Sequence, residues 1–367
     1  MKSSSARVLG VGLVGLTPAR SWAAVAHLPA LACLQEHFKV VGIANSSVES
    51  AQRAVASTKI GSAFELDHML QSKDIDIVSV TVKVAGHFTI LERAIAAGKN
   101  VYCEWPLALT VNDARQLAAQ ADAAGVKAVI GLQGIVSPEL SVLQNLVASG
   151  AVGKVLSTSI SAAAGVWGSS VGADQVYSLD VDSGANLLTV PFGHLVPMIE
   201  KVLGPIATIS AELATGRDKV VIRDTGEMAD ATAPDQLVIA GTMVGGAVLS
   251  IHMRGGLPSA EPFVWEIYGS DGVVRMVGDR GQPQMAACRI YLGKGEGPLE
   301  EVVVDDVQPS PLPHKGPARN VGLIYASMGA DIHSGSNTAP TFAQAVRVHE
   351  VIEAVKRSAA FHQRTTV

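Results

Sequence analysis

Residues 7–31 read RVLGVGLVGLTPARSWAAVAHLPAL, and this stretch decides the fold of the chain. The nearly continuous apolar run over residues 8–16 is typical of a parallel strand that is buried on both faces. Gly10, Gly12 and Gly15 match the pattern G-x-G-x-x-G, but in this register all three glycines fall within the strand. By itself the pattern fits an ordinary core strand, with glycines for close packing, as well as it fits a nucleotide-binding turn.

The end of this strand is the part that predicts a ligand. Gly15 stands at the strand's end, and a turn through Thr17 and Pro18 follows it. A helix that opens near Arg20 or Ser21 would direct free backbone N–H groups at a pyrophosphate, as in proteins that bind dinucleotides. We therefore expect this turn to hold the phosphates of a dinucleotide.

Composition and charge limit the possible functions. The chain has 367 residues, enough for two domains, and a formal net charge of -5 without a basic cluster, which argues against nucleic acid as a direct partner. Three scattered cysteines and ten dispersed histidines show no ligand spacing, so we expect no metal. No stretch reaches the ~18 apolar residues that a membrane span needs. The N-terminal apolar run is short and rich in glycine, so we interpret it as a strand rather than a signal peptide and expect a cytoplasmic protein.

Strands and helices alternate through the first third of the chain. Apolar runs predict strands at residues 39–44, 62–64, 75–84, 100–103 and 127–132, and helical patterns lie between them at residues 48–57, 65–71, 87–97 and 110–124. Thr110 and Asp113 form a capping box at the start of the last of these helices. The alternation predicts a doubly wound parallel sheet, a Rossmann domain over residues 1–134, with ligands at the carboxyl ends of the strands.

The second half of the chain, residues 135–367, has a different pattern. Helical stretches at residues 138–149 and 186–203 precede a series of strands joined by hairpin signals, such as Gly245-Gly246 between residues 237–243 and 247–253. Two helices, at residues 321–333 and 342–360, close the chain. We expect an α+β domain with a large open, mostly antiparallel sheet and helices on one face. Because a bare apolar face is a liability, we expect a second subunit on the other face, in a dimer or tetramer.

Residues 97–107, AGKNVYCEWPL, resemble the motif A-G-K-H-V-x-C-E-K-P-L of the glucose–fructose oxidoreductase / inositol dehydrogenase (Gfo/Idh/MocA) family. His87, residues 184–194 and the two-domain order agree with this family. Within it, the turn that contains Trp22, the pair Glu104-Trp105 and the sequence TVPFGH at residues 189–194 are most similar to the branch of the yeast galactose-regulon repressor. The resemblance extends from end to end of the chain and implies a bound NAD or NADP.

The strand ends and the resemblance together indicate which residues bind the cofactor. The resemblance implies that Glu104 touches the nicotinamide ribose. At the end of the second strand, where an acidic residue usually binds the adenosine ribose, the chain has no acid and no adjacent arginine, so the choice between NAD and NADP stays open. The expected cofactor-binding residues are Gly15, Leu16, Thr17, Arg20, Trp22, Asn45, Ser46, Val82, His87, Glu104 and Trp105.

The departures from the family concern proton transfer. In the family's enzymes a lysine, an aspartate and a histidine form the proton-transfer group, and the matching residues here are Trp105, Val190 and His194. Neither tryptophan nor valine can usefully exchange a proton, and Pro197 replaces an aspartate that usually supports the histidine. His194 is our first choice for the catalytic acid or base, with a core histidine as the alternative. We hypothesise that Lys83 supplies the amine that Trp105 lacks, a solvated strand-end lysine being the alternative.

Two functions from different classes follow from these residues. The favoured one is an NAD(P)-dependent oxidoreductase that acts on a hydroxyl, carbonyl or imine carbon of a small molecule, with Trp105, Tyr177, Asp182 and Asn186 lining the substrate cleft. The alternative is a non-catalytic, NAD(P)-sensing transcriptional regulator, similar to the galactose repressor, that binds a protein partner. The loss of two proton-transfer residues favours the regulator, whereas imine chemistry, which needs less acid–base help, keeps the oxidoreductase open.

Overall fold

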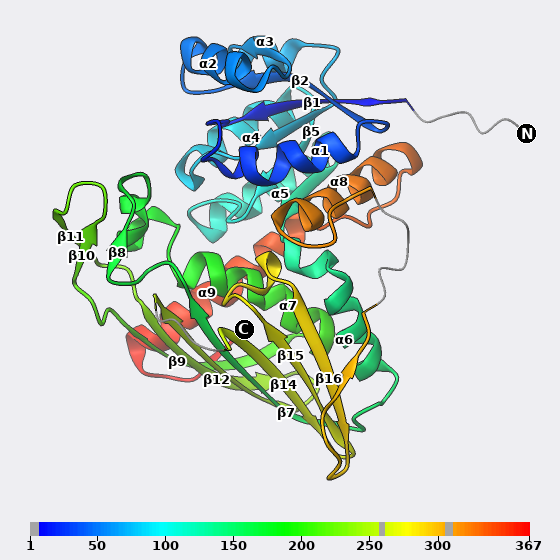
Figure 1. Ribbon diagram of the computed structural model, residues 1–367, viewed down its shortest axis with the longest axis vertical. Helices are drawn as coiled ribbons and strands as arrows, with labels where there is room; N and C mark the ends of the chain where they lie inside the picture. Colours follow the sequence, from blue (N-terminus) through cyan, green and yellow to red (C-terminus); the bar gives the residue numbers. More distant parts are fainter. Residues whose placement is uncertain (1–6, 257–260, 305–310) are drawn as a thin grey trace, which may run out of the picture. The chain divides into compact units, whose positions relative to one another are not determined.

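The computed structural model describes residues 7–256, 261–304 and 311–367 of the chain (Figure 1). Two compact units are present. The first comprises residues 1–133 and 308–346, and the second comprises residues 134–307 and 347–367. Residues 308–346 therefore lie with the N-terminal unit, whereas the sequence pattern grouped them with the second half. The physical reason is the packing of helix α8 (Pro317–Ser334), which contacts the first helical segment of the chain.

The first unit contains a six-stranded parallel sheet in the order β3-β2-β1-β4-β5-β6, which confirms the predicted doubly wound fold. The chain order reverses between β1 and β4, and this switch point is where open α/β sheets bind their ligands. The strands are β1 (Leu9–Val14), β2 (Phe38–Ala44), β3 (Ser62–Phe64), β4 (Ile77–Val80), β5 (Asn100–Glu104) and β6 (Ala128–Gly131). The helical segments are η1 (Ala23–His27), α1 (Leu28–Cys33), α2 (Val48–Thr58), α3 (Leu66–Gln71), η2 (Val84–Gly86), α4 (His87–Ala96) and α5 (Val111–Ala124).

In the first unit, most of the local structure that the sequence predicts is present. The side chain of Thr110 accepts a hydrogen bond from the backbone N–H of Asp113, as the capping box predicts. One boundary was wrong: the strand predicted over residues 75–84 ends at Val80. Val80 is the last residue of β4 that pairs with β1 and β5, so Lys83 lies beyond the sheet and is exposed.

The second unit is organised around a nine-stranded sheet in the order β17-β16-β15-β14-β7-β13-β12-β9-β18. All neighbouring strands are antiparallel except β7 and β13, so the prediction of a mostly antiparallel sheet is confirmed. The strands are β7 (Val155–Ala164), β9 (Ile206–Ala214), β12 (Gln236–Met243), β13 (Val248–Gly255), β14 (Phe263–Gly269), β15 (Gly272–Gly278), β16 (Cys288–Lys294), β17 (Glu300–Val302) and β18 (Thr365–Thr366).

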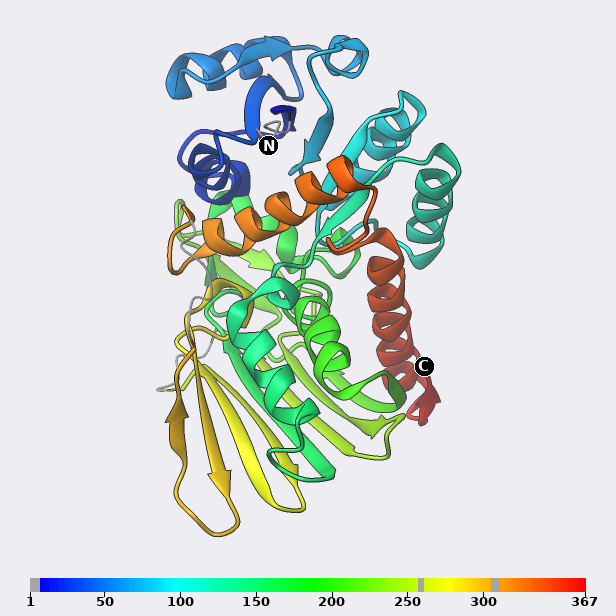
Figure 2. The same ribbon diagram turned by 90° about the vertical axis from the view of Figure 1, so that its right-hand side faces the viewer.

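Helices cover one face of this sheet (Figure 2). They are α6 (Pro138–Ala148), α7 (Gly193–Leu203) and α9 (Phe342–Phe361), the last of which begins in the first unit. Arg347 of α9 donates to the carboxylate of Glu200 on α7, which fixes the two helices together. Alternate residues of the strands are buried beneath these helices, among them Ile239, Ile251 and Ile160, which are aligned across β12, β13 and β7.

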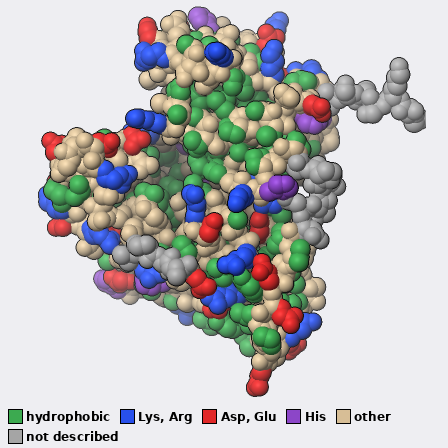
Figure 3. Space-filling model, in the orientation of Figure 1, with side chains coloured by type: hydrophobic (Ala, Val, Ile, Leu, Met, Phe, Trp, Pro, Cys, Tyr) green, Lys and Arg blue, Asp and Glu red, His purple; other side chains and the backbone are tan. Residues whose placement is uncertain are grey.

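The opposite face of the sheet, which we call the outer face, mixes exposed apolar and charged side chains. Val238 and Val248 are exposed on it, and Glu266 of β14 pairs across the sheet with Arg275 of β15. On the surface drawn in Figure 3, side chains of both charges are interspersed. The surface drawn in Figure 3 therefore has no dominant charge.

A smaller sheet in the second unit was not predicted. It consists of β8 (Ser170–Val171), β10 (Lys219–Ile222) and β11 (Met228–Asp230), and the short helical turns η4 (Ala173–Leu179) and η5 (Val181–Ser183) follow β8. Its core consists of Val171, Leu179 and Val220. These three strands have only two to four residues each, and their own residues show too little alternation to have predicted them. Among the described residues, no helix is long and apolar enough to cross a membrane.

Candidate functional site

The first part of the candidate site is the turn after β1. Gly15 has a φ of +104°, and a Cβ at this position would lie 2.6 Å from Cγ1 of Val82, so only glycine fits between the ends of β1 and β4. The chain then turns through exposed Thr17 and Arg20 and enters its first helix at Trp22. Within the described part of the chain, the buried indole Nε1 of Trp22 has no hydrogen-bond partner.

Asn45, at the end of β2, holds this turn in place. Its Oδ1 accepts from the backbone N–H of Leu16 at 2.8 Å, and its Nδ2 donates to the carbonyl of Leu16 at 2.9 Å. An aspartate could not make the second bond, because an ionised carboxylate has no hydrogen to donate. The structure thus explains why an amide stands where an acid is usual. Ser46, the next residue, is exposed at the same edge of the sheet.

His87, the first residue of α4, connects the segments that follow β4 and β5. Its Nε2 lies 2.9 Å from the carbonyl oxygen of Val82, and its Nδ1 lies 2.8 Å from that of Pro106. Burial lowers the pKa of this imidazole, so the ring is neutral near pH 7 and donates to one of these carbonyls at a time. His87 therefore positions both segments from inside the unit.

Glu104, the last residue of β5, belongs to a chain of buried polar groups that sequence reasoning missed. Its Oε1 lies 2.9 Å from Nε2 of His27, and its Oε2 accepts from Nε2 of Gln133 at 2.6 Å. His27 is 0% exposed and Glu104 is 9% exposed. A carboxylate can be buried when hydrogen-bond donors replace the water it loses, and both oxygens of Glu104 meet this condition.

Tyr325 of α8 completes this chain from a distant part of the sequence. Its hydroxyl lies 2.8 Å from Nδ1 of His27 and 2.8 Å from Oγ of Ser79 in β4. Burial raises the pKa of Tyr325 far above its ordinary value, so the phenol stays protonated. We call Glu104, Gln133, His27, Tyr325 and Ser79 the buried polar chain. His27 lies within the opening stretch, but nothing near Tyr325 in the sequence indicates this contact.

Trp105 and Lys83, the two remaining predicted site residues of the first unit, differ in their exposure to solvent. Trp105 follows Glu104 and is almost fully buried, so its indole forms part of the interior at the carboxyl end of β5. Lys83 precedes η2, where its side chain is exposed. The side chain of Cys103 is buried beside His87, and burial, together with the charge of Glu104, raises the pKa of this thiol. Cys103 is therefore unsuited to act as a nucleophile near pH 7.

The second unit carries the other predicted residues on and before α7. His194 is buried in the first turn of α7, directly after η6 (Leu188–Phe192), which places Val190 one turn earlier. The Oδ1 of Asn186 accepts from the backbone N–H groups of Leu188 and Thr189, so this amide caps the start of η6. The remaining two, Tyr177 and Asp182, are exposed on η4 and η5.

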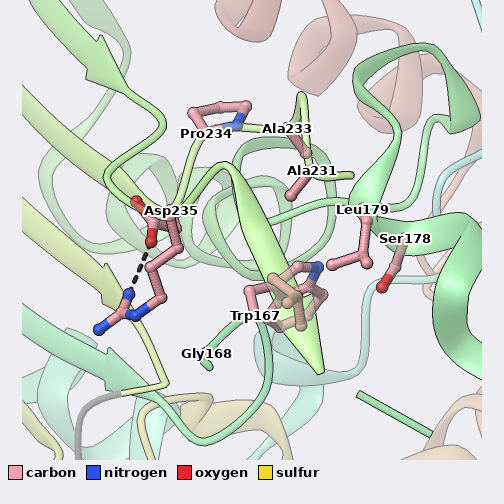
Figure 4. Close-up of a pocket in the computed structure, with 10 residues that line it drawn as sticks. Trp167, Gly168, Ser178, Leu179, Ala231, Ala233, Pro234 and Asp235 are labelled. Carbon is pink, nitrogen blue, oxygen red and sulfur yellow. Dashed lines mark hydrogen bonds and ion pairs between the residues drawn. The ribbon is translucent and has the colours of Figure 1, made fainter. Parts of the chain in front are cut away.

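A small pocket lies beside η4 in the second unit (Figure 4). Trp167, Leu179 and Pro234 line it, together with an ion pair in which Arg217 donates to Asp235 at 2.6 Å. Its volume is about 250 Å³ with the solvent at its mouth included, which is less than the space of about 300–1,000 Å³ that small-molecule sites usually offer. Within the described residues, no three His, Cys, Asp or Glu side chains are grouped as metal ligands.

Two families match this chain. The oxidoreductase family with an NAD-binding Rossmann fold matches residues 9–163, and the family of the Gal80p C-terminal domain matches residues 138–278. The first match covers the parallel sheet with its switch point, and the second match covers part of the large mixed sheet. Residues 9–163 therefore match the Gfo/Idh/MocA oxidoreductase family, and residues 138–278 match the Gal80p C-terminal domain.

Individual relatives are of two kinds. The galactose/lactose metabolism regulatory protein GAL80 of Kluyveromyces lactis is 28% identical over 308 residues, which cover 78% of this chain and 67% of the relative. The dehydrogenase aclE of Aspergillus oryzae is 28% identical over 256 residues, which cover 67% of this chain and 69% of the relative. The crystal structure of a super-repressor mutant of Gal80p from Saccharomyces cerevisiae superposes with a TM-score of 0.88 at 23% identity and covers 98% of both chains.

Proposed function

We propose that this protein binds NAD or NADP at the carboxyl edge of the first sheet and transfers hydride between the nicotinamide and a hydroxyl, carbonyl or imine carbon of a small molecule. The observation that carries the cofactor assignment is the turn after β1. It lies at the switch point of the sheet, contains no carboxylate to repel a phosphate, and carries the cation Arg20. The orphaned Nε1–H of Trp22 adds a buried donor that a phosphate or ribose oxygen would satisfy.

The remaining residues of the cofactor set have two different roles in this proposal. Thr17, Arg20, Trp22 and Ser46 belong to the surface that meets the dinucleotide. Gly15, Leu16, Asn45, Val82 and His87 act by holding that surface in shape, since their contacts are made within the unit. Glu104 retains unused lone pairs beside its two donors, so it can also accept from the nicotinamide ribose.

The nicotinamide supplies the hydride chemistry, and the chain must supply a group that exchanges the proton of the substrate's oxygen or nitrogen. We assign this role to His194, because the matched tryptophan and valine positions cannot perform it. Lys83 is the second candidate, and its exposure leaves it accessible to a substrate. In this proposal the exposed groups of Tyr177 and Asp182 bind substrate oxygens, while Asn186 shapes the segment before His194.

Oxidation of NAD(P)H in the presence of sugars, keto acids and imines tests this assignment. We expect His194→Asn to lower kcat by roughly 10²–10⁴-fold, whereas His37→Asn, which changes an exposed histidine of the first unit, leaves kcat unchanged. Lys83→Met should lower kcat at least about tenfold if its amine takes part, with Lys73→Met as the matched control. An unchanged kcat in Lys83→Met removes Lys83 from the mechanism.

A second candidate function is a regulator that binds NAD(P) and a protein partner without turnover. Trp105 and Val190, which replace two proton-transfer residues, favour it, and so does the similarity to GAL80. One comparison distinguishes the two functions. A regulator binds the dinucleotide in calorimetry but does not consume it with any substrate tested. Failure to bind NAD(H) or NADP(H) at millimolar concentration would contradict both functions.

We also propose that two copies of the chain associate through the outer face of the nine-stranded sheet. Helices already cover the other face (Figure 2), and exposed Val238, Val248 and Tyr268 lie on the outer face. A second copy would remove these side chains from water. The assembly would be a dimer, or a tetramer built from dimers.

A further inference from the structure

The charge of Glu104 is fixed in the interior of the first unit, and this has a consequence for the cofactor. We infer that Glu104 makes the protein bind the oxidised nicotinamide more tightly than the reduced one. The inference rests on the proposed binding of NAD(P), and it applies whether or not the protein turns over a substrate.

The contacts around Glu104 place a side-chain nitrogen within hydrogen-bond distance of each of its carboxyl oxygens. Gln133 can only donate through Nε2, and this amide nitrogen lies 2.6 Å from Oε2. If Ser79 donates to Tyr325 and Tyr325 donates to Nδ1 of His27, then Nε2 of His27 carries the hydrogen and donates to Oε1. In this assignment each contact within the buried polar chain joins a donor to an acceptor, and both oxygens of Glu104 are acceptors, as in a carboxylate.

The place of Glu104 in the sheet puts this charge on the nicotinamide side. In a doubly wound sheet the two halves on either side of the switch point each bind one mononucleotide. The turn after β1 and the end of β2 belong to the adenosine half, and β4, β5 and β6 belong to the other. Glu104 ends β5, the middle strand of that second half.

The surroundings of Glu104 allow its charge to act over a distance. Tyr102, Cys103 and His87 are buried around it, and after burial itself the negative charge of Glu104 is a cause of the raised pKa of Tyr102 and of Cys103. Oxidised nicotinamide carries a positive charge on its ring, and the reduced ring is neutral. At the effective dielectric constant of about 20 that suits such sites, one charge within the same site changes an equilibrium roughly tenfold.

The test measures, by calorimetry, the Kd values of the oxidised and reduced forms of whichever cofactor the protein binds. The wild-type protein should bind the oxidised form at least about fivefold more tightly. Glu104→Gln removes the charge and keeps the shape. Because Oε1 of Gln133 is buried without a partner among the described residues, rotation of the Gln133 amide lets it accept from the new amide. We expect this variant to weaken binding of the oxidised form about tenfold and that of the reduced form less than twofold.

Two control variants separate charge from packing. Asp122→Asn removes an exposed carboxylate at the end of α5 and should leave both Kd values unchanged. Tyr325→Phe removes a hydroxyl from the buried polar chain but keeps the charge of Glu104, so the thermal stability should fall while the ratio of the two Kd values stays as in the wild type.

The possible outcomes are distinct. A wild-type ratio in Glu104→Gln, an equal loss of both forms, or the same change of ratio in Tyr325→Phe overturns the inference, while cofactor binding and the proposed function stand. If Glu104→Gln does not fold, the ratio of the two Kd values of the wild-type protein is the test, and a preference for the oxidised form below about fivefold overturns the inference. If the wild-type protein binds neither form, the proposed function fails, and the inference fails with it.

Discussion

The close approach between Gly15 and Val82 makes Gly15→Ala the most informative change to the candidate site. A residue other than glycine at φ +104° is strained by about 1–3 kcal/mol. The new Cβ would also lie 2.6 Å from Cγ1 of Val82 and 3.0 Å from its backbone nitrogen, and overpacking of this kind costs about 1–3 kcal/mol more. We therefore expect a loss of about 2–6 kcal/mol in the free energy of unfolding.

Thermal unfolding followed by circular dichroism measures this loss. For a unit of this size each kcal/mol corresponds to about 2–4 °C in Tm, so a loss of about 3 kcal/mol lowers Tm by about 6–12 °C. Gly98→Ala is the matched control, because Gly98 has a φ of +70° but no heavy atom within 4 Å of a Cβ. It reports the backbone strain alone, about 1–2 kcal/mol.

A double-mutant cycle with Val82→Ala isolates the steric part. Removing the Val82 methyl groups eliminates the 2.6 Å contact, so Gly15→Ala should be at least about 1 kcal/mol less damaging in the Val82→Ala background. If Gly15→Ala lowers the free energy of unfolding no more than Gly98→Ala does, a Cβ at position 15 does not clash with Val82. The same conclusion follows if the cycle shows no coupling between positions 15 and 82.

Three further predictions concern other parts of the molecule. Tyr325→Phe leaves buried His27 and Ser79 groups without their shared partner, so thermal unfolding should show a loss of roughly 2–3 kcal/mol. The control Tyr177→Phe, at a residue that is 37% exposed, should lose less than about 0.5 kcal/mol, and equal losses in the two variants would contradict the buried polar chain. Burial opposes ionisation of Asp331, but donors that include the backbone N–H of Ala339 outweigh it and hold its pKa below the ordinary value. This stability is present above the unfolded-state pKa of about 4 and is lost as the pH falls through the lower folded-state pKa, so Asp331→Asn should flatten the decline that denaturant unfolding measures between about pH 4 and pH 2. Val248→Lys should dissociate the oligomer in sedimentation velocity, while Val244→Lys, in the turn of the same hairpin, should not; an outcome in which the wild-type protein is already a monomer would disprove association through the outer face.

The elements that the sequence predicted well are those whose signals are local. The strands predicted at residues 237–243 and 247–253 pair as the antiparallel ladder of β12 and β13, because Gly245-Gly246 and the alternation on either side act within a few residues. The helix after Thr110 begins where its capping box predicts, for the same reason.

The boundaries that depend on a partner strand were less predictable. Residues 75–84 remain apolar or small to the end, yet β4 stops at Val80. The residues of a strand indicate which of its faces packs against the core. The position of the last hydrogen bond of a ladder depends instead on where the neighbouring strands end. Lys83 was predicted to lie at a strand end from hydrophobicity alone, and hydrophobicity does not indicate where the neighbouring strands end.

The site shows the same limit more strongly. Asn45 stands where a dinucleotide-binding protein usually contacts ribose, but whether its amide faces a ligand or the backbone of Leu16 depends on a contact between residues 29 positions apart. His27 and Tyr325 are 298 positions apart, and no periodicity or motif connects them. Side chains that act by positioning others leave little trace in a single sequence, because their partners are determined only by the completed fold.

The late position of Tyr325 in the chain affects how the protein matures during translation. A ribosome releases residues 1–133 long before α8 emerges, so the nascent Rossmann sheet must wait for nearly the whole of synthesis before His27 and Ser79 receive their shared hydroxyl. Until then Nδ1 of His27 and Oγ of Ser79 lack the hydroxyl that joins them, and the surface of η1 and α1 that α8 later covers is open to water. Chaperones that shield young chains would find this surface exposed for most of the time that the protein is being made.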